Sequence, residues 1–486
     1  MNTNWKTPFW GSSLHENLSV FTQEGPKILW VELTSKCPLN CEFCSRKLLR
    51  GDGQHMDFSV YKRLINDLID PKIIRLNYSG ESIHYPQLIE AINLASASGA
   101  TVELVTALVS IKKEMLRKLA SSKLDLLTIS LHTLDDAAYP ELYKFGTLSR
   151  LKQCISELLI EREKMGTGPK IDFGFVAMKS NLSQLNSLAD YAQRIGITKI
   201  NICPITRRDP IQKPYSYELE NNRLTPLFRK ELGAAINEVQ SLHSNIDIHI
   251  TNTENKSVMS LDSCPRTYAK ALPEYGRIFS CDQNPWETVH VLANGSVVVC
   301  EVQDKTAIGN LHDQSIQEIW HGQRYVQFRR DYVQGRNSEC NKCPWKMAFV
   351  PGILSTSVSV HKYSSQLLRG WYAPETNLVW SKTNSLLIIR TPYENSKIEL
   401  KGIIPPSKSG KPNKLEIYSQ GSIIGVVEND TDENKEFFFL STIKSDSASL
   451  MLAFKTLFAF HPGKHSQSDD TRALGFAFIS AIVKES

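Results

Sequence analysis

The sequence predicts an α/β protein in which a partial (β/α)6 barrel is followed by a small cysteine-rich α+β module and a C-terminal all-β sandwich. Three observations predict this order. Strand-like apolar runs alternate with amphipathic stretches between residues 27 and 206. Cysteines 264, 281, 300, 340 and 343 then fall within one turn-rich stretch. From residue 351 onward, short strands are separated by Gly, Pro, Asn and Ser, a spacing typical of β-sandwiches.

The barrel is predicted from six buried strands and the helices between them. Apolar residues three and four positions apart mark helices at 58–69, 87–98, 149–164 and 182–196. The predicted strands cover residues 27–33, 72–79, 101–106, 125–132, 170–178 and 199–205. Repeated βα units form a parallel sheet whose chemistry lies at the C-terminal strand ends. The first cysteines of the chain follow the first of these strands directly.

Composition excludes several classes of protein. With 486 residues, 41% of them apolar and 22% charged, the chain is neither disordered nor fibrous. A net charge of +5 without a basic block argues against a nucleic-acid partner. The absence of a long apolar run and of a signal-peptide pattern predicts a cytoplasmic protein with no membrane span. In such a protein, ten cysteines indicate metal or redox chemistry rather than disulfides.

The first cysteine group has the spacing Cys37-x3-Cys41-x2-Cys44. Three thiolates on one loop can hold three irons of a 4Fe-4S cluster and leave the fourth iron open, whereas structural zinc takes four closed ligands. With Phe43 before the last cysteine, the pattern resembles the radical S-adenosylmethionine (radical SAM) superfamily over about residues 27–206. The resemblance implies that the open iron binds SAM. It also implies that reductive cleavage of SAM gives a 5′-deoxyadenosyl radical that abstracts a substrate hydrogen atom.

Two further segments carry the same resemblance. Gly80 and Glu81 resemble the Gly-Gly-Glu segment that contacts the SAM amino group, with Ser79 in place of the first glycine. The alternative for Glu81 is a solvated turn carboxylate. Ser130 resembles the serine that faces the SAM ribose or carboxylate. His132 replaces the aspartate of that stretch and is either an ordinary hydrogen-bonded histidine or a contact to SAM or substrate.

A second group of four thiols follows the barrel, around a hairpin signal at Asn294-Gly295. Taken alone, it is either a four-cysteine zinc site or an iron–sulfur site. After a radical SAM barrel it resembles the SPASM or shortened twitch extension, with one auxiliary 4Fe-4S cluster. The layout is similar to that of 2-deoxy-scyllo-inosamine dehydrogenase, in which the auxiliary cluster can take the second electron of an alcohol oxidation. The expected ligands are Cys281, Cys300, Cys340 and Cys343.

Three other cysteines have different interpretations. Cys264 is an additional cluster ligand, a catalytic hydrogen-atom donor to a substrate radical, or a buried small apolar residue. Cys154 lies at apolar spacing on a predicted helix, and Cys203 ends the sixth predicted strand. Both are expected to serve packing.

The C-terminal segment 369–486 resembles an accessory β-sandwich appended to glycosyltransferases. Trp371 and Trp380 either stack on sugar rings or pack in the core. The residues that carry this resemblance are Gly370, Trp371, Tyr372, Glu375, Trp380, Ser381, Asp470, Arg472 and Gly475.

The predicted domains follow from these motifs. They are an N-terminal extension (1–26), a radical SAM core (27–260), a SPASM/twitch domain (261–350), a linker (351–368) and the sandwich (369–486).

The resemblance implies a radical SAM oxidoreductase or epimerase acting on a carbohydrate, an aminocyclitol or a glycan-linked molecule. An external one-electron reductant such as flavodoxin or ferredoxin is the expected partner. One alternative is a maturase of a ribosomally made peptide, against which the short segment before the first strand argues. The other is a non-enzymatic, zinc-stapled glycan-binding protein.

Overall fold

The computed structural model contains two compact units. The first comprises residues 25–253 and 287–324, and the second comprises residues 1–24, 254–286 and 325–486. The described residues are 10–22, 24–41, 43–204, 226–250, 272, 276–281, 283–301, 306–343, 346–349, 354–360, 366–406, 411–444, 449–465, 470 and 472–486.

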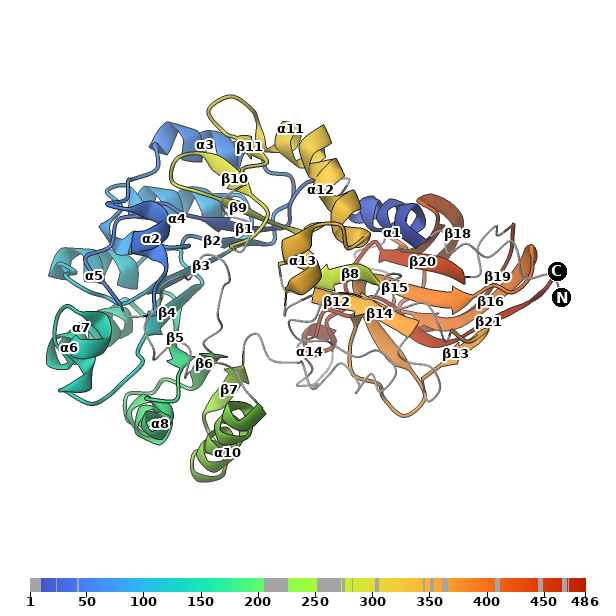
Figure 1. Ribbon diagram of the computed structural model, residues 1–486. Helices are drawn as coiled ribbons and strands as arrows, with labels where there is room; N and C mark the ends of the chain where they lie inside the picture. Colours follow the sequence, from blue (N-terminus) through green and yellow to red (C-terminus); the bar gives the residue numbers. More distant parts are fainter. Residues whose placement is uncertain are drawn as a thin grey trace. The chain divides into compact units, whose positions relative to one another are not determined.

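The first unit is built on a ten-stranded sheet in the order β11-β10-β9-β1-β2-β3-β4-β5-β6-β7 (Figure 1). Strands β1 to β7 pair in parallel, each with the next in the sequence. Their bounds are β1 Ile28–Val31, β2 Ile73–Arg75, β3 Thr101–Thr106, β4 Leu126–Ser130, β5 Lys170–Ala177, β6 Lys199–Pro204 and β7 Asp247–Ile250. The predicted (β/α)6 layout is therefore confirmed, with β7 as a further strand.

Helices connect these strands and cover one face of the sheet (Figure 1). The side chains of Leu29, Ile74 and Leu127 are fully buried, whereas their strand neighbours Trp30 and Arg75 are only partly buried. This alternation is expected for a strand, in which successive side chains point to opposite faces of the sheet. The helices are α2 Arg46–Arg50, α3 Phe58–Asn66, α4 Leu88–Ala97, α5 Lys113–Ala120, α6 Ala138–Tyr143, α7 Leu148–Met165, α8 Leu185–Arg194 and α10 Pro226–Leu242, with short 3-10 turns η2 Ser82–His84 and η3 Leu182–Gln184.

Local sequence explains where several helices begin and end. The carboxylate of Asp57 caps α3 by accepting a hydrogen bond from the Ser59 amide at 2.7 Å. Thr147 caps α7, which ends at Gly166 in the left-handed region, with φ of 64°. Within the described part of the chain, no helix is long and apolar enough to cross a membrane.

The predicted hairpin extends this same sheet. It consists of β9 Thr288–Val291 and β10 Ser296–Val298, joined through Gly295 with φ of 79°. Strand β9 pairs in parallel with β1, Trp30 lying opposite His290. Strand β11 Gly309–Asn310 and helix α11 Ile316–His321 follow. The sequence predicts the hairpin, but only the structure reveals that its first strand covers the free edge of β1.

The second unit contains the C-terminal antiparallel sheet, in the order β18-β17-β20-β15-β21-β16-β19. The first residues of β15 pair with β21 and the later ones with β20, so the two halves of the sheet share this strand. The predicted all-β module is thereby confirmed. The strands are β13 Ser357–Ser359, β14 Leu367–Trp371, β15 Val379–Arg390, β16 Asn395–Ile404, β17 Asn413–Ser419, β18 Ser422–Asn429, β19 Lys435–Lys444, β20 Ser449–Thr456 and β21 Ala477–Glu485, with helix α14 Pro462–His465 before the last.

The second unit also contains helix α1 Trp10–Ser19 with the turn η1 Val20–Thr22, and the elements β8 Arg277–Cys281, β12 Lys346–Phe349 and α13 Ser338–Lys342. Helix α12 Gln323–Val333 belongs to this unit from Tyr325 onward. Leu14 and Leu18 of α1 are fully buried in one apolar cluster with Ile388 and Met451 of the sheet. The buried Asn17 side chain donates a hydrogen bond to the Met451 carbonyl at 3.3 Å. No pattern in the sequence predicts this packing of the N-terminal segment.

Candidate functional site

The loop after β1 carries the first three thiols. Cys37 and Cys41 are half-buried and Cys44 is exposed, and the Cys44 amide donates a hydrogen bond to the Cys41 carbonyl at 3.1 Å. Burial raises the pKa of Cys37 to about 11 and raises the pKa of Cys41 further. Both thiols therefore hold their protons at neutral pH until a metal displaces them.

The ends of this loop are tied together by short-range hydrogen bonds. The Arg46 guanidinium donates to the carbonyl oxygens of Ser35 and Gly51 at 3.3 and 3.1 Å. The amide of Gln54 donates to the Ser35 hydroxyl at 2.9 Å, and its carbonyl accepts from the Ser35 amide, also at 2.9 Å. These contacts fix the loop on which the three thiols lie.

Gly80 and Glu81 lie directly against this loop. A Cβ at position 80 would collide with the carbonyl oxygen of Thr34, so only glycine allows this close approach. The Glu81 amide donates to the Lys36 carbonyl at 2.9 Å. The negative charge of Glu81 acts on the thiols of Cys37 and Cys41. The structure thus brings the second predicted SAM segment to the first cysteine group.

Glu81 is 4% exposed, which excludes the solvated-turn alternative. It accepts hydrogen bonds from the Thr106 hydroxyl at 2.7 Å and from the Ala107 amide at 2.9 Å. Burial raises the pKa of Glu81 to about 7 despite these donors. Its side chain thereby joins the C-terminal end of β3 to the segment after β2.

Ser130 and His132 lie at the end of β4. The Ser130 carbonyl accepts a hydrogen bond from the Tyr143 hydroxyl at 3.1 Å. The His132 Nδ1 accepts from the Val176 amide at 3.1 Å, and its ring stacks on Tyr143 at 5.4 Å between centroids. Burial lowers the pKa of His132 to about 3, so the ring is neutral. These contacts account for His132 as a hydrogen-bonded, packed residue.

Phe43 connects the cysteine loop to this strand end. Its ring meets the His132 ring edge-on, with 5.1 Å between centroids. It also packs against Met178, next to Leu142 and Val176. The aromatic residue of the cysteine motif therefore fixes the last turn of the loop against β4 and β5.

Three of the four expected auxiliary ligands gather in the second unit. Cys281 ends β8, Cys340 lies in α13 and Cys343 follows that helix. Burial raises the pKa of Tyr332 well above its usual value, and the thiols of Cys281, Cys340 and Cys343 raise it further. Cys300 follows β10 and belongs to the first unit, so its place in this ligand set stays a prediction.

The described thiols are not arranged around a single metal ion. Among the described residues, no three Cys, His, Asp or Glu side chains converge as they would around a single metal ion. In a 4Fe-4S cluster each thiolate binds a different iron, so the sulfur atoms surround a cage instead of one ion. The donor set, which is thiols only, suits such a cluster.

The remaining cysteines differ in position. Cys154 is buried in α7, in agreement with a packing role, and Cys203 is half-buried near the end of β6. Cys264 lies outside the described residues, and its three interpretations stay predictions.

The residues that carry the resemblance of the C-terminal segment have structural roles in the sheet. The Trp371 ring meets three phenylalanines edge-on, and its Nε1 donates to the Leu386 carbonyl at 2.8 Å. Arg472 pairs with Asp470 at 2.7 Å and with Glu375 at 2.8 Å. A Cβ at Gly370 would collide with the carbonyl of Asn384. For Trp371 the structure favours the core over sugar stacking.

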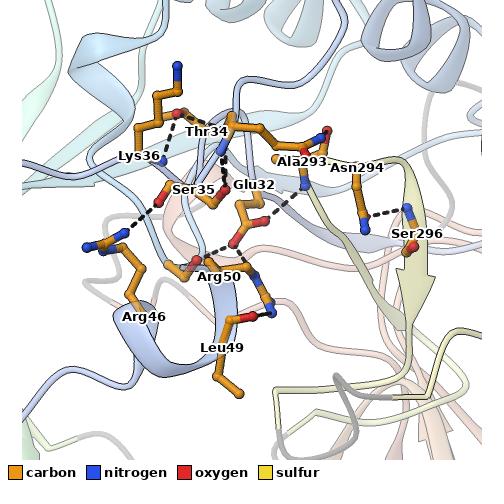
Figure 2. A network of polar contacts seen from close by, with 12 residues as sticks. Glu32, Thr34, Ser35, Lys36, Arg46, Leu49, Arg50, Ala293, Asn294 and Ser296 are labelled. Atoms are coloured by element: carbon orange, nitrogen blue, oxygen red, sulfur yellow. Dashed lines mark hydrogen bonds and ion pairs between the residues drawn. The ribbon is translucent and has the colours of Figure 1, made fainter. Parts of the chain in front are cut away.

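Glu32 is a buried polar residue at this site that the sequence analysis does not single out. Figure 2 shows its carboxylate between Arg50 and Ala293, beside the cysteine loop. The Arg50 guanidinium lies 3.1 Å from Glu32 Oε1, and the Ala293 amide donates to Oε2 at 2.9 Å. The available signal was a carboxylate within the apolar run 27–33, because a charge at a buried position needs partners.

Two family models match the chain. Residues 31–159 match the model of the radical SAM superfamily, and residues 281–344 match the SPASM iron–sulfur cluster-binding domain.

Curated relatives are similar over about two thirds of the chain. The tungsten-containing aldehyde ferredoxin oxidoreductase cofactor-modifying protein of Pyrococcus furiosus is 23% identical, covering 65% of this chain and 87% of that protein. The PqqA peptide cyclase of Gluconobacter oxydans is 21% identical, covering 61% of this chain and 76% of that protein.

Two solved structures are also similar. Streptococcus suis SuiB bound to the precursor peptide SuiA is 16% identical, with a TM-score of 0.49, over 63% of this chain and 67% of that chain. BtrN in complex with AdoMet and 2-DOIA is 15% identical, with a TM-score of 0.35, over 66% of this chain and 92% of that chain.

Proposed function

We propose that this chain, a radical SAM enzyme by its radical SAM and SPASM domains, abstracts a hydrogen atom from an unactivated carbon of a peptide substrate. The radical SAM domain implies a 4Fe-4S cluster with SAM, and the SPASM domain implies auxiliary iron–sulfur clusters. The observation that carries the proposal is the loop with three thiols after β1, against which Gly80 and Glu81 pack.

The roles of the residues follow from their positions. Cys37, Cys41 and Cys44 would bind three irons of the first cluster. Gly80 lets the backbone approach the loop, where the segment with Glu81 would receive the SAM amino group. When bound, the cluster would supply one electron to SAM. That electron would cleave SAM into methionine and a 5′-deoxyadenosyl radical, and the radical would take the hydrogen atom from the substrate.

At the end of β4, Ser130 would contact the SAM ribose or carboxylate. Phe43 packs against His132, beside this strand end, and holds the last turn of the cysteine loop. The neutral His132 adds no charge at this strand end.

One auxiliary cluster is proposed, with Cys281, Cys340 and Cys343 as ligands from the second unit and Cys300 as the fourth. Cys281 and Cys340 pack in one apolar cluster with the buried Tyr332, which supports it. Such a cluster can accept the second electron when a substrate radical is oxidised. An external one-electron reductant such as flavodoxin or ferredoxin would supply the first electron, in a cytoplasmic setting.

Two substrate classes have support. The relatives named PqqA peptide cyclase favour a peptide. The sequence resemblance of residues 369–486 to a sandwich appended to glycosyltransferases favours a carbohydrate or aminocyclitol, with oxidation or epimerisation as the outcome. The similarity to these relatives includes the radical SAM and SPASM domains, which would carry the reaction. We therefore propose a peptide as the first candidate substrate and a carbohydrate or aminocyclitol as the second.

The test is anaerobic formation of 5′-deoxyadenosine by the reconstituted wild-type protein with SAM and dithionite. A Cys37→Ala variant is the matched control and should form none. Addition of a peptide-rich cell fraction should raise the rate, and prior digestion of that fraction with protease should remove the increase. A protease-resistant, glycosidase-sensitive increase would reject the peptide in favour of the carbohydrate. Formation of 5′-deoxyadenosine by the Cys37→Ala variant would reject the proposed cluster site.

A further inference from the structure

The carboxylate of Glu32 connects four segments of the first unit. Glu32 directly follows β1 and is 1% exposed. One oxygen, Oε1, accepts hydrogen bonds from the Arg50 guanidinium and the Ser79 hydroxyl, and the other accepts from the Ala293 amide (Figure 2). These partners come from α2, from the segment after β2 and from the turn between β9 and β10.

Each of these partners adjoins an element of one of the two proposed cluster sites. Arg50 ends the helix that follows the cysteine loop, and Ser79 immediately precedes Gly80 and Glu81. Ala293 lies in the hairpin whose second strand leads to Cys300. A single buried carboxylate therefore spans the first cysteine loop, the SAM-binding segment and the hairpin of the SPASM domain.

The hairpin turn is attached at a second point. The Gln54 side-chain amide donates to the Ala293 carbonyl at 3.3 Å, while the backbone of Gln54 closes the cysteine loop through Ser35. Ala293 thus has both its amide and its carbonyl bonded to the loop region. A shift of the hairpin would break both contacts, and a shift of the loop would do the same.

The network also explains the departure from the Gly-Gly-Glu pattern at position 79. Glycine at this position offers no donor, whereas the serine hydroxyl donates to Glu32 Oε1. The buried Glu32 and the partly buried Arg50 form an ion pair, with side chains 1% and 13% exposed. Removal of either member would leave a poorly solvated charge, so their positions are mutually fixed.

We infer that Glu32 and Ser79 are positioning residues for SAM: they hold the segment of Gly80 and Glu81 in register with the cysteine loop and the hairpin. This inference rests on the proposed function. Glu32 and Ser79 would affect SAM binding through the segment of Gly80 and Glu81, without contacting SAM themselves. Ser79 provides the specific contact, and Glu32 transmits it to Arg50 and Ala293.

The test is an anaerobic SAM titration of the reduced, reconstituted full chain, followed by the EPR signal of the SAM-responsive cluster. The variants are Ser79→Gly, Ser79→Ala and Glu32→Gln. Glu161→Gln is the matched control, because Glu161, like Glu32, is an ion-paired glutamate, although it is only half-buried, and it lies on α7 beside Arg117 and Lys164. Iron content and thermal unfolding are recorded for each protein.

Both Ser79 variants and Glu32→Gln should retain their iron and need about tenfold more SAM for half-saturation, the effect of losing one hydrogen bond to a charged group. Glu161→Gln should titrate like the wild type. A merely structural role would move the unfolding temperature and leave the SAM titration unchanged. If Ser79→Ala and Ser79→Gly give SAM titration curves that coincide with the wild-type curve, the inference is overturned. This holds even where Glu32→Gln fails to retain iron.

The wild type alone tests the proposed function. A wild-type protein whose cluster does not respond to SAM overturns that function, and this inference with it. A wild-type cluster that responds to SAM, together with variants whose SAM titration matches that of the wild type, overturns this inference only.

Discussion

Replacement of Glu81 by glutamine should change how the stability of the metal-free protein depends on pH. Burial raises the pKa of this carboxyl group from 4.5 to about 7, so the folded state favours the protonated form. The full difference corresponds to about 3 kcal/mol, at 1.36 kcal/mol for each pH unit. Glu81 is almost fully buried, so solvent screening does not reduce this figure substantially.

The sign follows from linkage. Below about pH 4.5 the carboxyl group is protonated in both the folded and the unfolded state, and it adds no pH-dependent cost. As the pH rises from 4.5 to 7, the unfolded state ionises first, and the free energy of unfolding falls. Between pH 5 and pH 8 the wild type should lose about 2.5 kcal/mol through this group.

The Glu81→Gln variant lacks this loss. Its amide nitrogen can donate to the Thr106 hydroxyl, which accepts as well as donates, while its carbonyl oxygen accepts from the Ala107 amide. The protonated carboxyl group of the wild type has the same arrangement of one donor and one acceptor. The variant should therefore be close to the wild type in stability at pH 5 and about 2 to 3 kcal/mol more stable at pH 8.

Urea unfolding of both metal-free proteins at pH 5 and pH 8, under reducing conditions, measures these differences. Titration of all other groups cancels between the two proteins. A Thr106→Val variant keeps the carboxylate but removes the donor that lowers its pKa, and it should steepen the loss of stability toward pH 8. Parallel pH profiles for wild type and Glu81→Gln would refute the reasoning.

Three further predictions concern other parts of the chain. The Cys37→Ala, Cys41→Ala, Cys44→Ala triple variant should hold about four irons where the wild type holds about eight, and an anaerobic iron count that falls to zero would exclude the second cysteine group as a cluster site. The folded-state pKa of His132 is lowered to about 3, so its contribution to stability is lost as the pH falls below 6.5. Thermal unfolding at pH 7 and pH 5 measures this effect. Between these two pH values the free energy of unfolding should fall by about 2 kcal/mol less in His132→Phe than in the wild type, and an equal fall in both proteins would contradict this. Trp371→Ala should destabilise the C-terminal sheet by about 3 to 5 kcal/mol, as measured by near-UV circular dichroism during denaturation, whereas a change below about 1 kcal/mol would argue for a surface role.

Much of the barrel could be predicted because its signals are local. Strand and helix periods appear within windows of five to fifteen residues, and each of the six predicted strands is present, for example β3 at Thr101–Thr106. The first cysteine group is equally local, since its three thiols fall within eight positions of one loop. Gly80 was found through its motif, and the structure adds the reason, which is the close approach of Thr34.

The contacts that the sequence analysis missed join residues far apart in the chain. Glu32 and Ala293 are 261 positions apart, and Asn17 and Met451 are 434 positions apart. Neither pair has a periodic pattern. The second cysteine group is divided for the same reason, because Cys300 belongs to the first unit while Cys281 belongs to the second.

The sequence by itself determined the parallel α/β core, the antiparallel C-terminal module and the cysteine chemistry, because periodicity and ligand spacing are properties of neighbouring residues. Only the tertiary structure decided that β9 pairs with β1, that α1 packs into the core of the C-terminal sheet and that Glu32 joins the loop to the hairpin. These outcomes depend on which strand edge is free and which buried charge needs a partner. The free strand edge and the buried charge each obtain a partner only when segments far apart in the chain come together. No local sequence pattern encodes that pairing.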